Sequence, residues 1–124
     1  MIKPKGIDHI VLKTANLDAM LSFYTHILGC VVERQIDTPI HLVQLRCGSS
    51  LIDLEWIADS PLAEGRLGHF CLLIDCDDLE GLISQLIQLG IEVPAPEVRY
   101  GATGFGHSVY ILDPDGNQVE LKPT

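Results

Sequence analysis

The chain has 124 residues, which suits one domain or one domain built from two small similar halves. With 47% hydrophobic and 20% charged residues it has the composition of a globular protein with a core. The formal net charge of −9 argues against nucleic acid or an anionic membrane as partner, because both attract basic surfaces. No apolar run reaches membrane-spanning length and residues 1–5 do not resemble a signal peptide, so we expect a cytoplasmic protein.

The first half of the chain predicts the order β-α-β-β-β. A strand over residues 7–12 is followed by a helix that begins after Asn16, a good N-cap residue, and ends at Gly29. Apolar residues recur between them at helical spacing: Leu17, Met20, Leu21, Tyr24 and Leu28. Three further strands are then expected at residues 30–37, 40–47 and 51–56.

The second half predicts the same order after a linker at residues 58–67. A strand at 68–74 leads to a helix that is capped by Asp77 or Asp78 and closed by a glycine. A short strand is expected around 91–93. The glycine-rich stretch 99–106 is expected to be a loop, either a lid over a site or a plain connection.

The chain ends in a predicted β-hairpin. The turn Asp113-Pro114-Asp115-Gly116-Asn117 is dense in turn-forming residues, and a strand is expected on each side of it. Because side chains alternate along a strand, Glu120 shares a face with Gln118 and Lys122. If this face is concave, Glu120 points into a cavity.

The two halves repeat, and each carries a histidine near its start and a carboxylate near its end. His9 corresponds to His69, sixty residues on, and Asp53 corresponds to Glu120. Two imidazoles with one or two carboxylates suit a first-row divalent ion such as Fe, Mn, Co, Ni or Zn. The sequence therefore predicts a metal site made of these four residues, with Glu55 as an alternative to Asp53.

Three other side chains are candidates for contacts in the same site. Tyr110 lies across the hairpin from Glu120, where it either reaches the cavity or is a buried structural residue. His107 is either a substrate contact or an ordinary strand residue, and Arg99 is a candidate for holding an anionic group. The four cysteines lack zinc-site spacing, so we expect buried free thiols.

Several segments carry a resemblance to a known family: residues 7–12, Phe23-Tyr24 with Leu28-Gly29, 68–70 and 109–121. Together they resemble the vicinal oxygen chelate superfamily, which contains glyoxalase I, bleomycin resistance proteins and extradiol dioxygenases. The resemblance implies an α+β domain over residues 1–124. Two βαβββ modules, about residues 5–57 and 67–123, would form a curved mixed sheet with a metal-binding trough, usually in a homodimer.

The resemblance also implies a ligand set and a reaction. His9, His69 and Glu120 correspond to metal ligands, and Asp53 stands where glyoxalase-like members normally have a glutamate ligand. The favoured function is a metal-dependent lyase or isomerase of glyoxalase type. It would bind a small substrate through adjacent oxygens and stabilise an enediolate, with Glu120 or a displaced Asp53 moving the proton.

Two alternatives remain open from the sequence. One is an Fe(II)- or Mn(II)-dependent ring-cleaving dioxygenase of extradiol type, in which Tyr110 assists catalysis. The other is a non-catalytic protein that binds a small, antibiotic-like molecule on the same scaffold. All three functions involve a small molecule rather than nucleic acid or membrane.

Overall fold

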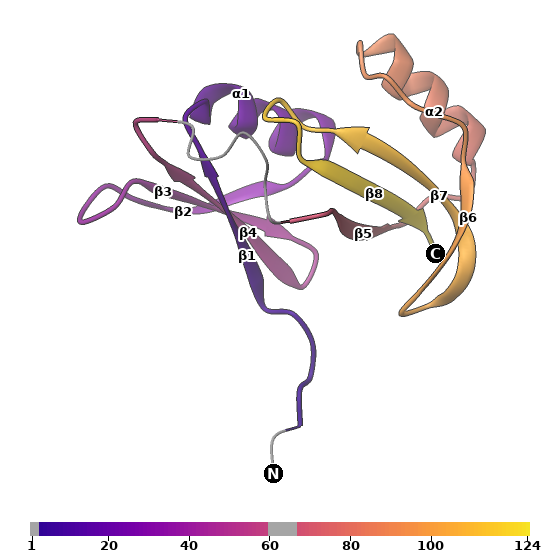
Figure 1. Ribbon diagram of the computed structural model, residues 1–124, viewed down its shortest axis with the longest axis horizontal. Coiled ribbons are helices and arrows are strands. Elements are labelled where there is room, and N and C mark those ends of the chain that lie inside the picture. The colour runs from indigo at the N-terminus through magenta and orange to yellow at the C-terminus, as the bar shows by residue number, and fades with distance from the viewer. Residues whose placement is uncertain (1–2, 60–66) are drawn as a thin grey trace. The chain divides into compact units, whose positions relative to one another are not determined.

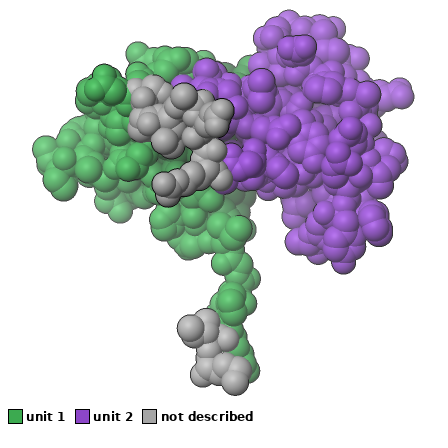
Figure 2. Space-filling view, viewed as in Figure 1, with its two compact units in different colours: residues 1–63 green, residues 64–124 purple. Residues whose placement is uncertain are grey.

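The computed structural model describes residues 3–59 and 67–124 of the chain. The chain divides into two compact units, residues 1–63 and 64–124 (Figure 2). Each unit has the element order β-α-β-β-β, which confirms the predicted α+β fold of two βαβββ modules. Most of the predicted linker, residues 60–66, lies outside the described residues. Among the residues that are described, no helix combines the length and apolar character needed to cross a membrane.

The first unit contains a four-stranded mixed sheet in the order β1-β4-β3-β2 (Figure 1). Strand β1 (His9–Thr14) is parallel to β4 (Ser50–Trp56). Strand β3 (Leu42–Cys47) is antiparallel both to β4 and to β2 (Val31–Ile36). Alternate residues of the inner strands are fully buried and form the core of this unit with residues of the helix: Met20, Tyr24, Val43, Leu45, Ile52 and Leu54.

The helix of the first unit follows the predicted apolar spacing but changes its winding. Helix α1 (Leu17–Ser22) continues directly into a π-helical turn, η1 (Phe23–Ile27). Asn16 occupies the N-cap position, although its side chain makes no capping hydrogen bond. Gly29 follows the helix with φ of 74°, the left-handed conformation that favours glycine and confirms the predicted end.

The second unit repeats this arrangement in the order β5-β8-β7-β6. Strand β5 (Phe70–Ile74) is parallel to β8 (Gln118–Pro123), and β7 (Gly104–Leu112) is antiparallel both to β8 and to β6 (Glu97–Gly101). Helix α2 (Leu79–Gln88) begins at Asp78, whose carboxylate accepts a hydrogen bond of 3.0 Å from the Gly81 amide. Of the two predicted caps, Asp77 and Asp78, the structure therefore uses Asp78.

The segment between α2 and the final hairpin differs from the prediction. Residues 91–93 form no strand, because Pro94 follows at once and cannot donate a ladder hydrogen bond. The expected loop at 99–106 is instead a β-hairpin of β6 and β7 that turns at residues 102–103. Its glycines made the stretch look irregular, but its aromatic side chains pair across the strands: the rings of Tyr100 and Phe105 are 4.9 Å apart.

Two glycines of this hairpin, Gly101 and Gly106, make room for a lysine of the neighbouring strand β8. A Cβ atom on Gly106 would lie 3.1 Å from Cε of Lys122, and one on Gly101 would lie 3.3 Å from its Nζ. Lys122 is only 3% exposed, and its ammonium group donates to the Gly104 carbonyl. The glycine-rich composition therefore reflects close packing over a long side chain rather than a flexible lid.

Asp113 organises the turn between β7 and β8. Its Oδ1 accepts hydrogen bonds from the amides of Asp115 (3.0 Å) and Asn117 (2.8 Å), and its Oδ2 accepts one from the Asn117 side chain (2.8 Å). Asp113 is 4% exposed. We predict that Asp113→Ala lowers the free energy of unfolding in urea by about 1–3 kcal/mol, because part-buried donors lose their acceptor. Asp115→Ala, at an exposed position of the same turn, should change it by less than about 0.5 kcal/mol. Equal losses would contradict this assignment.

Candidate metal and substrate site

Glu120 is the centre of a polar cluster in the second unit. It lies on β8 and is 6% exposed. Ser108 Oγ donates a hydrogen bond of 2.8 Å to its Oε2, and Tyr110 Oη donates one of 2.9 Å to its Oε1. Both donors come from β7, where Tyr110 is the register partner of Glu120. The hairpin thus fixes the carboxylate from one side.

His69 approaches the same carboxylate from the other neighbouring strand. Its Nε2 lies 3.2 Å from Oε1 of Glu120, and its ring packs edge-on against Tyr110 with centroids 5.6 Å apart. His69 directly precedes β5 and is two residues from Cys71, the register partner of Glu120. Residues two apart in an extended chain share a face, so His69 and Cys71 both lie on the side of Glu120.

The environment of Glu120 favours its ionised form. Burial by itself raises the pKa of this carboxyl group. Hydrogen bonds from Ser108, Tyr110 and Cys71, together with the nearby His69, outweigh burial and hold the pKa below its usual value. Burial and the hydrogen bond to Glu120 raise the pKa of Tyr110, which keeps its hydroxyl protonated as a donor. The cluster therefore combines an anionic oxygen with an imidazole.

Arg99 extends the cluster along the hairpin. Its Nε donates a hydrogen bond of 3.1 Å to Tyr110 Oη, its guanidinium carbon lies 5.8 Å from the centroid of the Tyr110 ring, and Glu97 accepts a further bond from it. The Tyr110 hydroxyl is thus fixed between a cation and a carboxylate. On the same face of β7 and β8, Tyr110 also borders a cleft of about 430 Å³ that is lined by Leu112, Gln118 and residues 90–92 and 94.

The first unit holds the corresponding carboxylate, Asp53, at 3% exposure. Gln44, its register partner on β3, donates a hydrogen bond of 3.2 Å to Oδ2. The other oxygen, Oδ1, is buried and makes no hydrogen bond. A buried carboxylate oxygen without a partner is energetically costly, so the position favours a cation or a donor that comes from outside the unit.

His9 lies on the same face of the sheet as Asp53. Val11 is the register partner of Asp53, and His9 precedes Val11 by two residues. The Nδ1 atom of His9 lies 2.7 Å from Oδ2 of Asp8. This hydrogen bond, with the charges of Asp53 and Asp8, raises the pKa of His9, although partial burial opposes the rise. The bond to Asp8 uses Nδ1 and orients the ring, so Nε2 is the nitrogen that could bind a ligand.

Each unit therefore places one histidine and one carboxylate on the same face, as the repeat suggested. Within residues 3–59 and 67–124, no group of three or more His, Cys, Asp or Glu side chains lies close enough to hold a metal ion. Glu55, the alternative to Asp53, forms an ion pair of 3.8 Å with Lys13. It is thus engaged elsewhere, and Asp53 is the better candidate.

Some residues of the cluster were not anticipated, and one that the sequence left open lies outside it. Ser108 and Gln44 were missed, although both follow from alternation and cross-strand pairing once the register is known. His107 is exposed and lies on the face of β7 opposite Ser108 and Tyr110, so it does not join the cluster. All four cysteines are free, but only Cys30 is buried: Cys47 and Cys76 are partly exposed, and Cys71 is exposed on the edge strand β5. The prediction of free thiols is thus confirmed, and the prediction of burial holds for Cys30 alone.

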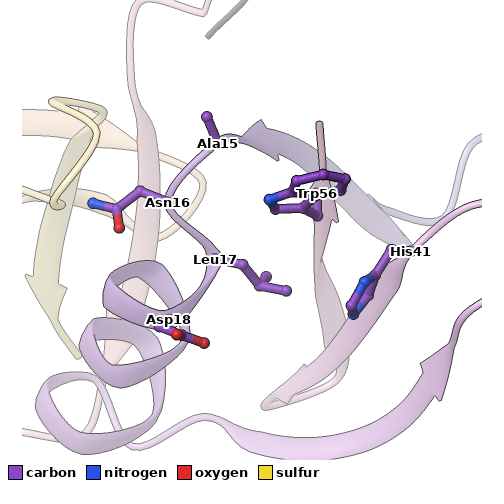
Figure 3. Close-up of a pocket in the computed structure, with 6 residues that line it drawn as sticks. All are labelled: Ala15, Asn16, Leu17, Asp18, His41 and Trp56. Carbon is purple, nitrogen blue, oxygen red and sulfur yellow. The ribbon is translucent and has the colours of Figure 1, made fainter. Parts of the chain in front are cut away.

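The first unit also has a hollow of about 370 Å³ at the start of α1 (Figure 3). The rings of Trp56 and His41, 6.4 Å apart, form one wall, and Leu17 points toward them from the helix (Figure 3). Trp56 is three residues from Asp53 on β4 and therefore faces the other side of the sheet. This hollow contains none of the predicted metal ligands.

Comparison with known proteins agrees with this architecture. The sequence model described as the Glyoxalase/Bleomycin resistance protein/Dioxygenase superfamily matches residues 6–121. The chain therefore belongs to the glyoxalase/bleomycin resistance protein/dioxygenase superfamily. The predicted family is thus confirmed. The match covers both units, in keeping with two copies of one module.

Individual relatives are more distant. Virulence protein STM3117 of Salmonella typhimurium is 29% identical over 93% of this chain and 81% of its own length. Glutathione transferase FosA of Serratia marcescens is 26% identical over 94% of this chain and 79% of its own length. The crystal structure of STM3117 has a TM-score of 0.76, with 99% of this chain and 98% of that chain covered. The FosX structure from Listeria monocytogenes, at a TM-score of 0.78 and 19% identity over 97% of this chain and 91% of that chain, supports the fold alone.

We predict that Lys122→Met loosens the β6–β7 hairpin. The substitution removes the donor to the Gly104 carbonyl but keeps most of the side-chain volume. Amide hydrogen exchange in residues 97–107 should accelerate, while exchange in the first unit stays unchanged. Lys13→Met, at an exposed ion pair, is the matched control and should leave the hairpin protected. Unchanged exchange in both variants would show that Lys122 does not hold the hairpin.

Proposed function

We propose that the chain is a metal-dependent enzyme that acts on a small substrate with two adjacent oxygens, as a lyase or isomerase of glyoxalase type. The ligands in this proposal are His9, His69 and Glu120, with Asp53 as a fourth. The observation that carries the proposal is the contact of 3.2 Å between His69 and the buried, ionised Glu120. The ion is a divalent metal such as Ni, Zn, Fe, Mn or Co, held within one chain or shared by the two chains of a homodimer.

The donor set suits such an ion. Nε2 of His69 and Oε1 of Glu120 lie 3.2 Å apart, and imidazole and carboxylate are donors that first-row divalent ions accept, so both residues would hold one ion. The unpartnered Oδ1 of Asp53 is a buried acceptor that a cation would satisfy. The bond between His9 and Asp8 resembles the outer-shell carboxylates that orient metal-bound histidines.

The chain's own residues would then divide the remaining work. A bound divalent ion supplies a Lewis acid that stabilises negative charge on the substrate oxygens. Arg99 and Glu120 fix the Tyr110 hydroxyl beside the cleft. Its single proton is donated to Glu120, so Tyr110 would orient the substrate by accepting a hydrogen bond from it. An oxygen of Glu120, or the Asp53 carboxylate when it is displaced from the metal, would take the proton from the substrate carbon and return it.

A second candidate is transfer of a thiol to a small molecule. The observation that favours it is the set of names among the relatives, which include a glutathione transferase and a metallothiol transferase. This reaction would use the same ion to polarise the acceptor molecule, while the thiol comes from a second substrate. The ring-cleaving dioxygenase and the non-catalytic binder stay as predictions that the assays below also test.

We predict that metal affinity depends on the proposed ligands. The wild-type protein should take up about one divalent ion per site, measured by elemental analysis and calorimetry. His69→Ala and Glu120→Gln should each weaken binding by at least about tenfold. His26→Ala, an exposed histidine on η1, is the control and should bind as the wild type does. A wild-type protein that takes up no divalent ion at micromolar concentrations would favour the non-catalytic binder.

We also predict that Tyr110→Phe lowers kcat by about ten- to a hundredfold while metal content is retained, because the substrate loses a fixed hydrogen-bond partner. Tyr100→Phe, at a 73% exposed tyrosine of the same hairpin, should have no effect. The metal-loaded protein would be assayed with the methylglyoxal–glutathione adduct, with fosfomycin plus glutathione, and with catechol plus oxygen. Turnover of the methylglyoxal–glutathione adduct supports the glyoxalase-type reaction. Turnover of only one of the other two mixtures would contradict it and support thiol transfer or ring cleavage instead.

A further inference from the structure

The first unit brings two thiols together away from the proposed metal ligands. Val31 on β2 is the register partner of Arg46 on β3, so the next step along this antiparallel ladder places Cys30 opposite Cys47. The two thiols are hydrogen-bond partners, and neither belongs to a disulfide. Cys30 is 6% exposed, whereas Cys47 is partly open to solvent.

The backbone at this position suits a covalent link. The amide of Cys30 donates to the carbonyl of Tyr24 at 2.9 Å, so the pair does not exchange both ladder hydrogen bonds. In such non-hydrogen-bonded pairs the two Cα atoms are about 4.5 Å apart, the closest approach in an antiparallel sheet. Disulfides span Cα separations of about 4.4–6.8 Å, and about 4.5 Å lies within this range. The disulfide can therefore form without a large movement of the backbone.

The two thiols also differ in reactivity. The hydrogen bond from Cys30 lowers the pKa of Cys47 to about 7, although burial opposes this shift. The same hydrogen bond, followed by burial, raises the pKa of Cys30 far above its usual value. Because the thiolate is the nucleophile, Cys47 is the attacking residue and Cys30 is the thiol that completes the bond.

We propose that Cys30 and Cys47 are a redox site that forms a reversible disulfide by reaction with a low-molecular-weight disulfide. The Cys47 thiolate attacks one sulfur of that molecule, forms a mixed disulfide and releases the other half as a thiolate. Cys30 then loses its proton to the released thiolate and attacks the Cys47 sulfur, which releases the second half. Overall, two protein thiols and one small disulfide give one protein disulfide and two small thiols.

The disulfide would tie the end of the helical segment to the sheet. Cys30 follows η1 and precedes the edge strand β2, while Cys47 ends β3. A disulfide between them closes a loop that contains both strands and lowers the conformational entropy of the unfolded state. The oxidised protein should therefore unfold at a higher temperature than the reduced protein. Neither cysteine is a proposed metal ligand, and the inference does not depend on the proposed reaction.

The test uses the reduced chain of 124 residues with excess oxidised glutathione under non-reducing conditions. The expected result is loss of two of the four free thiols, a monomeric chain lighter by two hydrogens, and a peptide map that joins Cys30 to Cys47. Dithiothreitol should restore all four thiols. The Cys71→Ser/Cys76→Ser double variant is the matched control and should form the same bond.

Two single variants separate the steps. In Cys30→Ala the reaction should stop at one glutathione bound to Cys47, and in Cys47→Ala no intramolecular disulfide should form. Cys47 is partly exposed, so its variant remains informative if the loss of buried Cys30 impairs folding. A peptide map that joins Cys71 or Cys76, a disulfide only between two chains, or four thiols left free would overturn the proposal.

Discussion

The structure of the second unit depends on keeping an ionised carboxylate inside a sheet. Glu120 lies on an inner strand that is buried on both faces, where Val119 and Leu121 pack on one side and Glu120 with Lys122 on the other. A buried carboxylate is tolerated only when hydrogen bonds replace the lost water. Strand β7 supplies the donors Ser108 and Tyr110, and His69 lies just before β5. Side chains from both sides of β8 therefore contact the Glu120 carboxylate. The proposed function rests on this convergence of Ser108, Tyr110 and His69 on one carboxylate.

The sequence predicted what local periodicity and pairing determine. The repeat of two βαβββ modules, the helix ends at glycines and the position of Tyr110 across from Glu120 all follow from residue spacing. The hairpin of β6 and β7 did not follow from spacing, because two of its glycines, Gly101 and Gly106, are explained by Lys122, which lies on another strand. A glycine in a sequence can indicate either a flexible backbone or a position where another group packs closely. Only the tertiary contacts show which of the two applies.

The same limit applies to the candidate site. Alternation along the strands placed each histidine with its carboxylate, because that relation is local to one module. The outer partners were beyond this reasoning. Gln44 holds Asp53 through the β3–β4 register, and Asp8 holds His9 from the adjacent position in the chain. Polar residues on strands usually face solvent, so nothing in their own neighbourhood distinguishes a supporting side chain from an ordinary one.

The two modules hold their carboxylates differently, and the difference follows from side-chain length. Glu120 has both oxygens in hydrogen bonds within its own unit, while Asp53 has one oxygen bonded to Gln44 and one oxygen bare. Aspartate is one methylene shorter, so it stays close to its strand and reaches fewer donors. A shorter carboxylate with a free oxygen is poorly satisfied by its own module and gains most from an external cation. By this reasoning Asp53, at a position where the family resemblance led us to expect glutamate, would gain more from a bound cation than Glu120 would.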